Sequence, residues 1–138
     1  MPIMISFRNK RISVCKVISA SPEAVWDILT DTRLWPAWGP SLLNVDCNDR
    51  YIKLDSKGRV KTLFLFWLPF TVTKFRHMHF WTWNIGPVKA TGHTLTRKNE
   101  MFCELCFDMA WWAAIYISVC WLALVKIDKI ATQKNSSS

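Results

Sequence analysis

The stretch from Met109 to Ala131 (MAWWAAIYISVCWLALVKIDKIA) constrains the fold of this chain more than any other. Its first 17 residues carry no charge, and it contains neither Gly nor Pro, so nothing in it breaks a helix. As one helix it would be roughly 34 Å long. Its second half carries an apolar stripe at helical spacing, formed by Tyr116, Cys120, Ala123, Ile127 and Ile130. Its first half is apolar all round, so we expect the rest of the chain to cover it.

The same stretch raises the question of a membrane. Seventeen uncharged residues between Asp108 and Lys126 lie at the lower limit of a membrane span. The preceding strand-like segments, however, need a helix to cover the apolar face of their sheet, and Lys126 and Lys129 lie opposite the apolar stripe. We therefore expect a packed helix, with peripheral contact between an exposed apolar face and a membrane as the alternative.

Composition indicates one folded domain. The chain has 138 residues, of which 51% are hydrophobic and nine are Trp, and this excludes disorder. We expect a single domain over residues 1–138, with frayed tails at 1–10 and 132–138. The Trp side chains either fill the core or line an apolar ligand pocket, and composition does not decide between these two roles.

The charge pattern argues against a protein that binds nucleic acid specifically. The net charge is +8, but no block of five like charges occurs and no nucleic-acid recognition motif is present. We therefore expect no specific nucleic-acid binding. The five Cys resemble no disulfide framework, and the N-terminus shows no secretion signal, so a reducing cytoplasm is the expected compartment.

Metal and cofactor motifs are weak. Cys103 and Cys106 form a CxxC, but on a strand two residues three apart point to opposite faces, so both are read as small hydrophobic residues. His77 and His79 alternate on one strand face, with no third His or carboxylate near them in sequence. We therefore predict no metal and no cofactor.

The remaining chain is expected to form one capped helix, a short second helix or turn at 34–38, and a series of strands. Ser21-Pro22-Glu23 is a strong helix start, because Ser caps, Pro fits the first turn and Glu suits the positive helix end. Strands are expected at 12–19, 42–46, 58–66, 68–75, 78–85, 90–97 and 101–109. Short connections favour an antiparallel meander with helices gathered on one face, which is an α+β domain.

Several local strings, in this order, resemble the START-like superfamily called SRPBCC, which includes the birch-pollen-allergen proteins and the polyketide cyclase/dehydrase group. The strings are Ala20-Ser21-Pro22-Glu23-Ala24-Val25-Trp26, DTRLWPAW at 31–38, Gly58-Arg59-Val60, Trp81-Thr82-Trp83, Ala90-Thr91-Gly92-His93 and the C-terminal helix. The resemblance implies a helix-grip fold. In that fold, a curved antiparallel sheet of about seven strands wraps around the long C-terminal helix, with two short helices between strands 1 and 2 and a cavity inside.

Pattern and resemblance together predict non-catalytic binding of a small hydrophobic or aromatic ligand, lipid- or polyketide-like, between sheet and helix. The predicted ligand-binding residues are Trp81, Trp83, His93, Leu105, Phe107, Tyr116, Val119, Cys120 and Ala123. Burial would supply most of the affinity, while His93 and Tyr116 would orient the ligand. A filled core without an enclosed void would argue against this prediction.

Two alternatives belong to other functional classes. The first is a cyclase or dehydratase-like enzyme in which His93 is the acid/base and Tyr116 polarises a carbonyl. The second is an interaction module that contacts a membrane or a second copy of the chain. Its expected patch consists of Trp111, Trp112, Ile115, Trp121 and Leu122. The sequence does not decide between monomer and homodimer.

Overall fold

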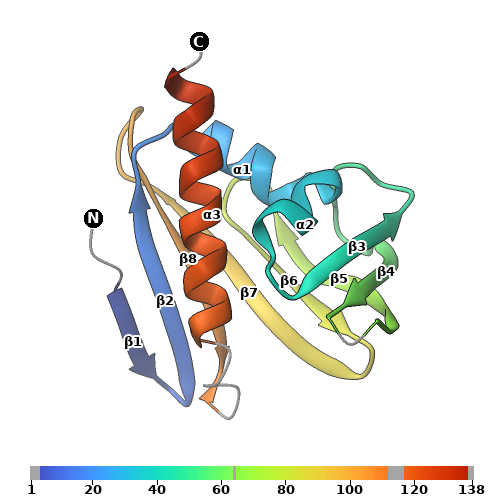
Figure 1. Cartoon of the computed structure of the whole chain (residues 1–138). Coiled ribbons are helices and arrows are strands. Elements are labelled where there is room, and N and C mark those ends of the chain that lie inside the picture. Colours follow the sequence, from blue (N-terminus) through green and yellow to red (C-terminus); the bar gives the residue numbers. More distant parts are fainter. Residues whose placement is uncertain (1–3, 64, 112–116, 137–138) are drawn as a thin grey trace.

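The computed structural model describes residues 4–63, 65–111 and 117–136 (Figure 1). Its strands are β1 (Met4–Arg8), β2 (Arg11–Ile18), β3 (Leu42–Cys47), β4 (Lys57–Thr62), β5 (Trp67–Arg76), β6 (Phe80–Ile85), β7 (Val88–Arg97) and β8 (Cys103–Ala110). Its helices are α1 (Pro22–Thr30), α2 (Trp35–Trp38) and α3 (Ile117–Ser136), and a 3-10 turn, Thr32–Leu34, joins the first two.

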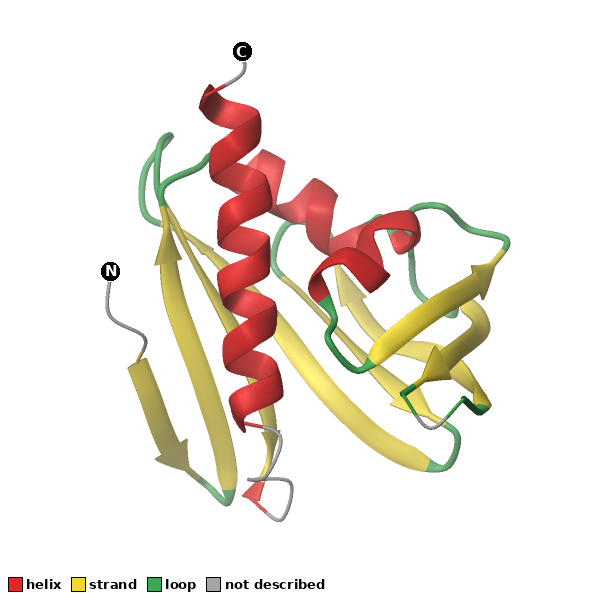
Figure 2. Cartoon of the chain, viewed as in Figure 1, coloured by secondary structure: helices red, strands yellow, loops and turns green. Residues whose placement is uncertain are grey.

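The strands form one eight-stranded antiparallel sheet in the order β1-β2-β8-β7-β6-β5-β4-β3. Strands β3 to β8 follow one another as a meander, and β8, at its end, pairs with β2 from the start of the chain. All three helices lie on one face of the curved sheet (Figure 2), and α3 contacts β2, α1 and α2. The expected α+β class and antiparallel sheet are confirmed.

The helix start at Ser21 is as predicted. The Ser21 Oγ accepts a hydrogen bond from the Ala24 amide at 3.2 Å, and Pro22 occupies the first turn. The short α2 is fastened to the end of α1 by two indole nitrogens. Trp35 Nε1 donates to the Leu29 carbonyl at 3.0 Å, and Trp38 Nε1 donates to the Ile28 carbonyl at 3.2 Å. These bonds satisfy carbonyls that a helix end leaves free.

The core lies between the sheet and the helices. In β8 every second residue is buried, so Cys103, Leu105 and Phe107 point inward as predicted. The predicted stripe of α3 is confirmed for Cys120, Ala123 and Ile127, which are all buried. No helix in the described part of the chain is long and apolar enough to cross a membrane.

Three expectations about element boundaries were wrong. Residues 4–8 are not a frayed tail but the edge strand β1, which gives eight strands where about seven were expected. Met109 and Ala110 belong to β8, where they pair with β2, so the C-terminal helix does not begin at Met109. At the other end α3 extends to Ser136, into the segment expected to fray.

The β1–β2 connection explains why β1 was missed. Asn9 and Lys10 both have positive φ, 52° and 61°, as a two-residue hairpin turn of type I′ requires. Turns of this kind usually contain Gly, whereas Asn-Lys gives little signal in the sequence.

The cysteine pattern also departs from expectation. Cys15 of β2 and Cys106 of β8 form a disulfide across 91 residues, although no disulfide framework was recognisable in the sequence. They lie directly opposite each other in the strand register, and sequence spacing cannot reveal that register. The CxxC was read correctly in one respect, because Cys103 points into the core and Cys106 to the opposite face.

Candidate functional site

Most residues predicted to bind ligand lie in the core between sheet and helix. Trp81, Trp83, His93, Leu105, Phe107, Cys120 and Ala123 are all buried, and Val119 is half-buried. Tyr116 lies outside the described residues. The structure therefore brings the predicted sheet residues together on the inner face.

Aromatic rings pack closely at the centre of this group. The Trp81 ring stacks on Trp35 at a centroid distance of 5.4 Å and on His93 at 3.9 Å. Trp83 meets Trp35 edge-on at 5.2 Å, and Phe107 meets His93 edge-on at 4.7 Å. Among the described residues, these Trp side chains therefore fill the core.

His93 belongs to a network of hydrogen bonds that also includes Thr91 and Trp83. Its Nδ1 lies 3.2 Å from the Trp81 carbonyl, which can only accept, so Nδ1 carries the proton. Nε2 then accepts from the Thr91 hydroxyl at 3.1 Å, and Thr91 Oγ1 in turn accepts from Trp83 Nε1 at 3.2 Å. Both ring nitrogens are thus engaged with protein atoms.

Burial lowers the pKa of His93 from 6.5 to about 4, so the ring is neutral near pH 7. The hydrogen bond to the Trp81 carbonyl and the charge of Asp108 oppose this shift only in part. A buried neutral imidazole with both nitrogens engaged is suited to holding strands together. Both His93 nitrogens are therefore taken up by protein atoms and are not free to act as the acid/base of the catalytic alternative, whose other residue, Tyr116, lies outside the described residues.

One indole nitrogen differs from its neighbours. Trp35, Trp38 and Trp83 each donate from Nε1 to a protein oxygen. Trp81 Nε1 is buried and has no hydrogen-bond partner in the described part of the chain. A buried donor of this kind is uncommon and marks a position where a hydrogen-bond acceptor would be stabilised.

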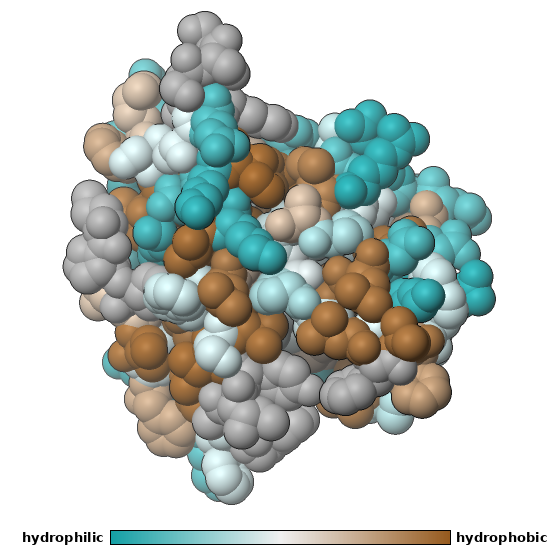
Figure 3. Space-filling model, viewed as in Figure 1, coloured by the Kyte–Doolittle hydropathy of each residue, from teal (hydrophilic) through white to brown (hydrophobic). Residues whose placement is uncertain are grey.

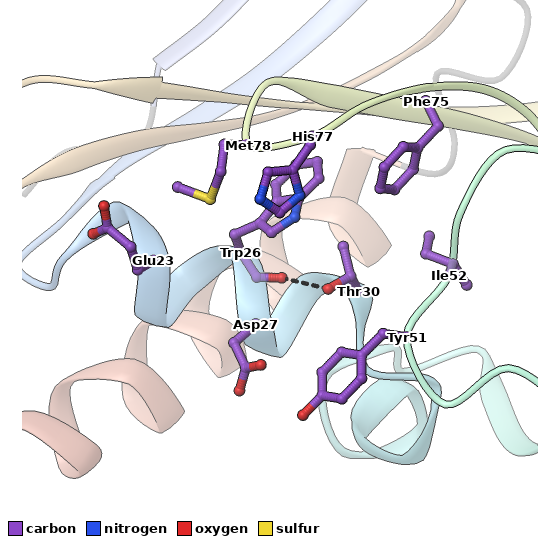
Figure 4. Close-up of a pocket in the computed structure, with 9 residues that line it drawn as sticks. All are labelled: Glu23, Trp26, Asp27, Thr30, Tyr51, Ile52, Phe75, His77 and Met78. Carbon is purple, nitrogen blue, oxygen red and sulfur yellow. Dashed lines mark hydrogen bonds between the residues drawn. The ribbon is translucent and has the colours of Figure 1, made fainter.

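A hollow of about 320 Å³ lies elsewhere, beside α1 (Figure 4). Three segments that are distant in sequence line it: α1, the loop between β3 and β4, and the end of β5 with the turn that follows it. The lining residues are Glu23, Trp26, Asp27, Thr30, Tyr51, Ile52, Phe75, His77 and Met78. We refer to this feature as the α1 hollow.

The floor of the α1 hollow is apolar and rigid. The Trp26 ring is 5.8 Å from the Phe75 ring and 6.0 Å from the His77 ring, which it meets edge-on. Trp26 and Ile52 are buried in the core, so their positions are fixed by packing. The Thr30 hydroxyl donates to the Trp26 carbonyl at 2.8 Å and is thereby directed back along α1 (Figure 4).

The rim of the hollow is acidic. Glu23 and Asp27 line it, and the lining residues that the structure describes include no Lys or Arg. The neighbouring guanidinium groups are engaged: Arg97 pairs with Glu23, and Arg50 pairs with Asp31 at 3.2 Å.

The surroundings shift the pKa of two rim groups. A hydrogen bond from Arg97 lowers the pKa of the Glu23 carboxyl, so this group is ionised at neutral pH. Partial desolvation raises the pKa of the Tyr51 phenol, and the Asp27 carboxylate adds to this shift. The phenol therefore stays neutral, and the negative charge of Glu23 is balanced by its ion pair with Arg97.

Of the residues predicted to bind ligand, none that the structure describes lines this hollow. A second hollow, of about 240 Å³, is mostly polar and is not lined by them either; it lies beside Thr32, Arg33, Asp46 and Arg50. The sequence contained one signal for the α1 hollow, because Trp26 follows the capped helix start. It did not reveal that the 51–52 and 75–78 segments would face that Trp.

The expected interaction patch is exposed where the structure describes it. Trp111 is 55% exposed, Trp121 44% and Leu122 40%, while Trp112 and Ile115 lie outside the described residues. Further apolar side chains are exposed at the start of β5 and just before it, at Leu65, Phe66 and Trp67. The space-filling view shows apolar surface on both sides of α3 (Figure 3).

No protein-family model and no curated protein matches the sequence. Solved structures do match the fold. The chain resembles protein Ms6760 from Mycobacterium smegmatis, with a TM-score of 0.66 at 13% identity, covering 99% of this chain and 100% of that one. It also resembles hypothetical protein jhp0584 from Helicobacter pylori, with a TM-score of 0.71 at 11% identity, covering 95% and 99%.

A conserved protein of unknown function from Enterococcus faecalis, EF2215, matches with a TM-score of 0.57 at 14% identity, covering 98% of this chain and 91% of that one. At these identities the likeness concerns the fold over nearly the whole chain, and it carries no activity with it.

Proposed function

We propose that this protein binds a small, largely apolar molecule without transforming it, and that the α1 hollow is the binding site. The observation that carries the proposal is a concave surface of about 320 Å³ floored by Trp26, Ile52, Phe75 and Met78. This volume is at the lower end of the range for small-molecule sites, which are typically apolar with a few polar groups at the edge. The superfamily resemblance and its helix-grip fold support ligand binding in general.

The acidic rim determines which ligands fit. A fatty-acid carboxylate would meet the carboxylates of Glu23 and Asp27, and the nearby Arg97 is already paired with Glu23. A neutral aromatic molecule, or one with an ammonium group, avoids this repulsion and can stack on the Trp26 and Phe75 rings. The proposed ligand is therefore a neutral or cationic aromatic compound rather than an anionic lipid.

Fluorescence titration with N-phenyl-1-naphthylamine, a neutral aromatic probe, tests the proposal. We expect saturable binding by the wild type and at least about tenfold weaker binding by Trp26→Ala, because removing the ring takes apolar area from the floor of the site. Laurate, an anionic competitor, is expected to displace the probe poorly.

The matched control is Trp121→Ala, which removes an exposed indole far from the hollow in sequence. It should bind the probe like the wild type. Because Trp26 is a core residue, Tyr51→Ala provides a second variant at the rim, where the side chain is 45% exposed and its loss leaves the core intact. Unchanged probe affinity in both Trp26→Ala and folded Tyr51→Ala would refute the proposed site.

The interior remains a second candidate site, and Trp81 Nε1 is the observation that favours it. A ligand carbonyl or hydroxyl there would satisfy this buried donor. Such a ligand would have to displace rings that stack at 3.9–5.4 Å. Loss of binding in a folded Trp81→Phe variant, which keeps most of the ring area and lacks the donor, would favour the interior over the α1 hollow.

A further inference from the structure

The outer face of the sheet carries three potential metal ligands close together. Cys15 lies directly across from Cys106 in the β2–β8 register, and Glu104 lies two residues from Cys106 on the same face of β8. Their ligand atoms all lie within 4.8 Å of one another, and Cys106 Sγ is 3.9 Å from a Glu104 carboxylate oxygen. All three residues are half-buried, so solvent reaches them.

The surroundings leave the Glu104 carboxylate available. Its neighbours across the strands are Val17 and Thr96, neither of which carries a charge. The nearest acid on the same face, Asp108, is instead paired with Arg11. Glu104 is thus an acceptor-only group beside two sulfur atoms.

The donor set suits zinc. Zn²⁺ is bound in proteins by thiolates at about 2.3 Å and carboxylate oxygens at about 2.0–2.2 Å, usually with four ligands in a tetrahedron. Ligand atoms within 4.8 Å of one another can surround one such ion after small side-chain rotations. Two thiolates and a carboxylate give three protein ligands, and exposure to solvent allows water to be the fourth.

We propose that Cys15, Cys106 and Glu104 form a zinc site that is open only when the Cys15–Cys106 disulfide is reduced. In the oxidised protein the two sulfur atoms are bonded to each other and cannot act as thiolates. A dithiol reductant transfers two electrons and two protons to the disulfide, giving two thiols, and itself becomes a disulfide. Zn²⁺ binding then displaces the two thiol protons to solvent.

This site is independent of the α1 hollow, since no residue is shared between them. It also differs from the metal sites considered from sequence, because Cys15 is 88 residues from Cys103 and only the strand register brings it to the CxxC. Oxidation would close the site and reduction would open it. Zinc occupancy would therefore follow the thiol–disulfide state of the surroundings.

The test is Zn²⁺ titration of the purified full chain against a chromogenic zinc indicator, with oxidised and anaerobically reduced samples compared. We expect one Zn²⁺ per chain in the reduced protein and none in the oxidised protein. Cys15→Ser and Cys106→Ser should abolish binding, and Glu104→Gln should weaken it at least about tenfold. Cys47→Ser and Cys103→Ser, which remove thiols outside the site, are the matched controls and should keep full binding.

A second measurement on the wild type avoids any folding defect in the variants. Zn²⁺ should protect Cys15 and Cys106 of the reduced protein from alkylation by iodoacetamide, while half-buried Cys47 reacts at an unchanged rate. Equal zinc binding in both oxidation states, or no protection of these two thiols at zinc saturation, would overturn the proposal.

Discussion

Replacing His93 by Gln is expected to remove a pH dependence from the free energy of unfolding. His93 is 1% exposed, and burial lowers its pKa from 6.5 in the unfolded chain to about 4 in the fold. Well above pH 6.5 neither state is protonated, so this group contributes no pH dependence there. Between pH 6.5 and 4 the unfolded state binds the extra proton, so stability falls as the pH falls.

The size of the effect follows from the shift. A difference of about 2.5 pKa units corresponds to about 3.4 kcal/mol lost from well above pH 6.5 to well below pH 4, of which about 2 kcal/mol is lost between pH 7.5 and 5. Gln keeps one donor for the Trp81 carbonyl and one acceptor for the Thr91 hydroxyl, but it does not titrate.

Urea unfolding at pH 7.5 and pH 5, with the disulfide intact, measures the effect. The stability advantage of the wild type over His93→Gln should shrink by about 2 kcal/mol on going to pH 5. His79→Gln, at an exposed His in the β5–β6 turn, is the control and should behave like the wild type. If His93→Gln and the wild type lose stability in parallel, the assignment of a buried neutral imidazole is refuted.

Two further predictions concern stability. Reduction of the Cys15–Cys106 disulfide should lower the free energy of unfolding by up to about 4.6 kcal/mol, because the unfolded chain gains conformational entropy when a loop with a sequence separation of 91 residues is opened. Urea titrations with and without a reductant check this, and equal midpoints would contradict it. Gly58→Ala should destabilise by about 1–3 kcal/mol, because the added Cβ would lie 2.4 Å from the Asp46 carbonyl and 2.8 Å from the Phe70 ring. A thermal midpoint equal to that of the wild type would refute the predicted clash.

Local sequence signals predicted the elements that local physics determines. Ser21 and Pro22 define the start of α1 by capping, and alternation in β8 placed Leu105 and Phe107 on the inner face. β1 was missed because its turn, Asn9-Lys10, adopts positive φ without the glycine that usually signals it. The boundary between β8 and the C-terminal helix could not be located within the long apolar stretch, because Met109 suits both a strand and a helix. Only its pairing with β2 assigns it to β8.

The candidate site was harder to foresee than the fold. Trp81, Trp83 and His93 were correctly expected to share the interior. Whether their rings line a cavity or fill it depends on how closely Trp35 of α2 packs against them, which the sequence does not show. The α1 hollow depends on three segments meeting in space. No local pattern indicates that Tyr51 and Phe75 will face Trp26.

The most direct test of the proposed binding site is the response of the indole N–H resonances to a neutral aromatic ligand. The indole N–H signals in a two-dimensional ¹H–¹⁵N spectrum can be assigned by single Trp→Phe replacements. During a titration with N-phenyl-1-naphthylamine, we predict that the Trp26 signal shifts progressively while those of Trp81 and Trp83 stay in place, because Trp26 lines the α1 hollow and Trp81 and Trp83 lie in the core. Shifts of Trp81 and Trp83 with Trp26 unmoved would contradict the account and place the ligand in the interior.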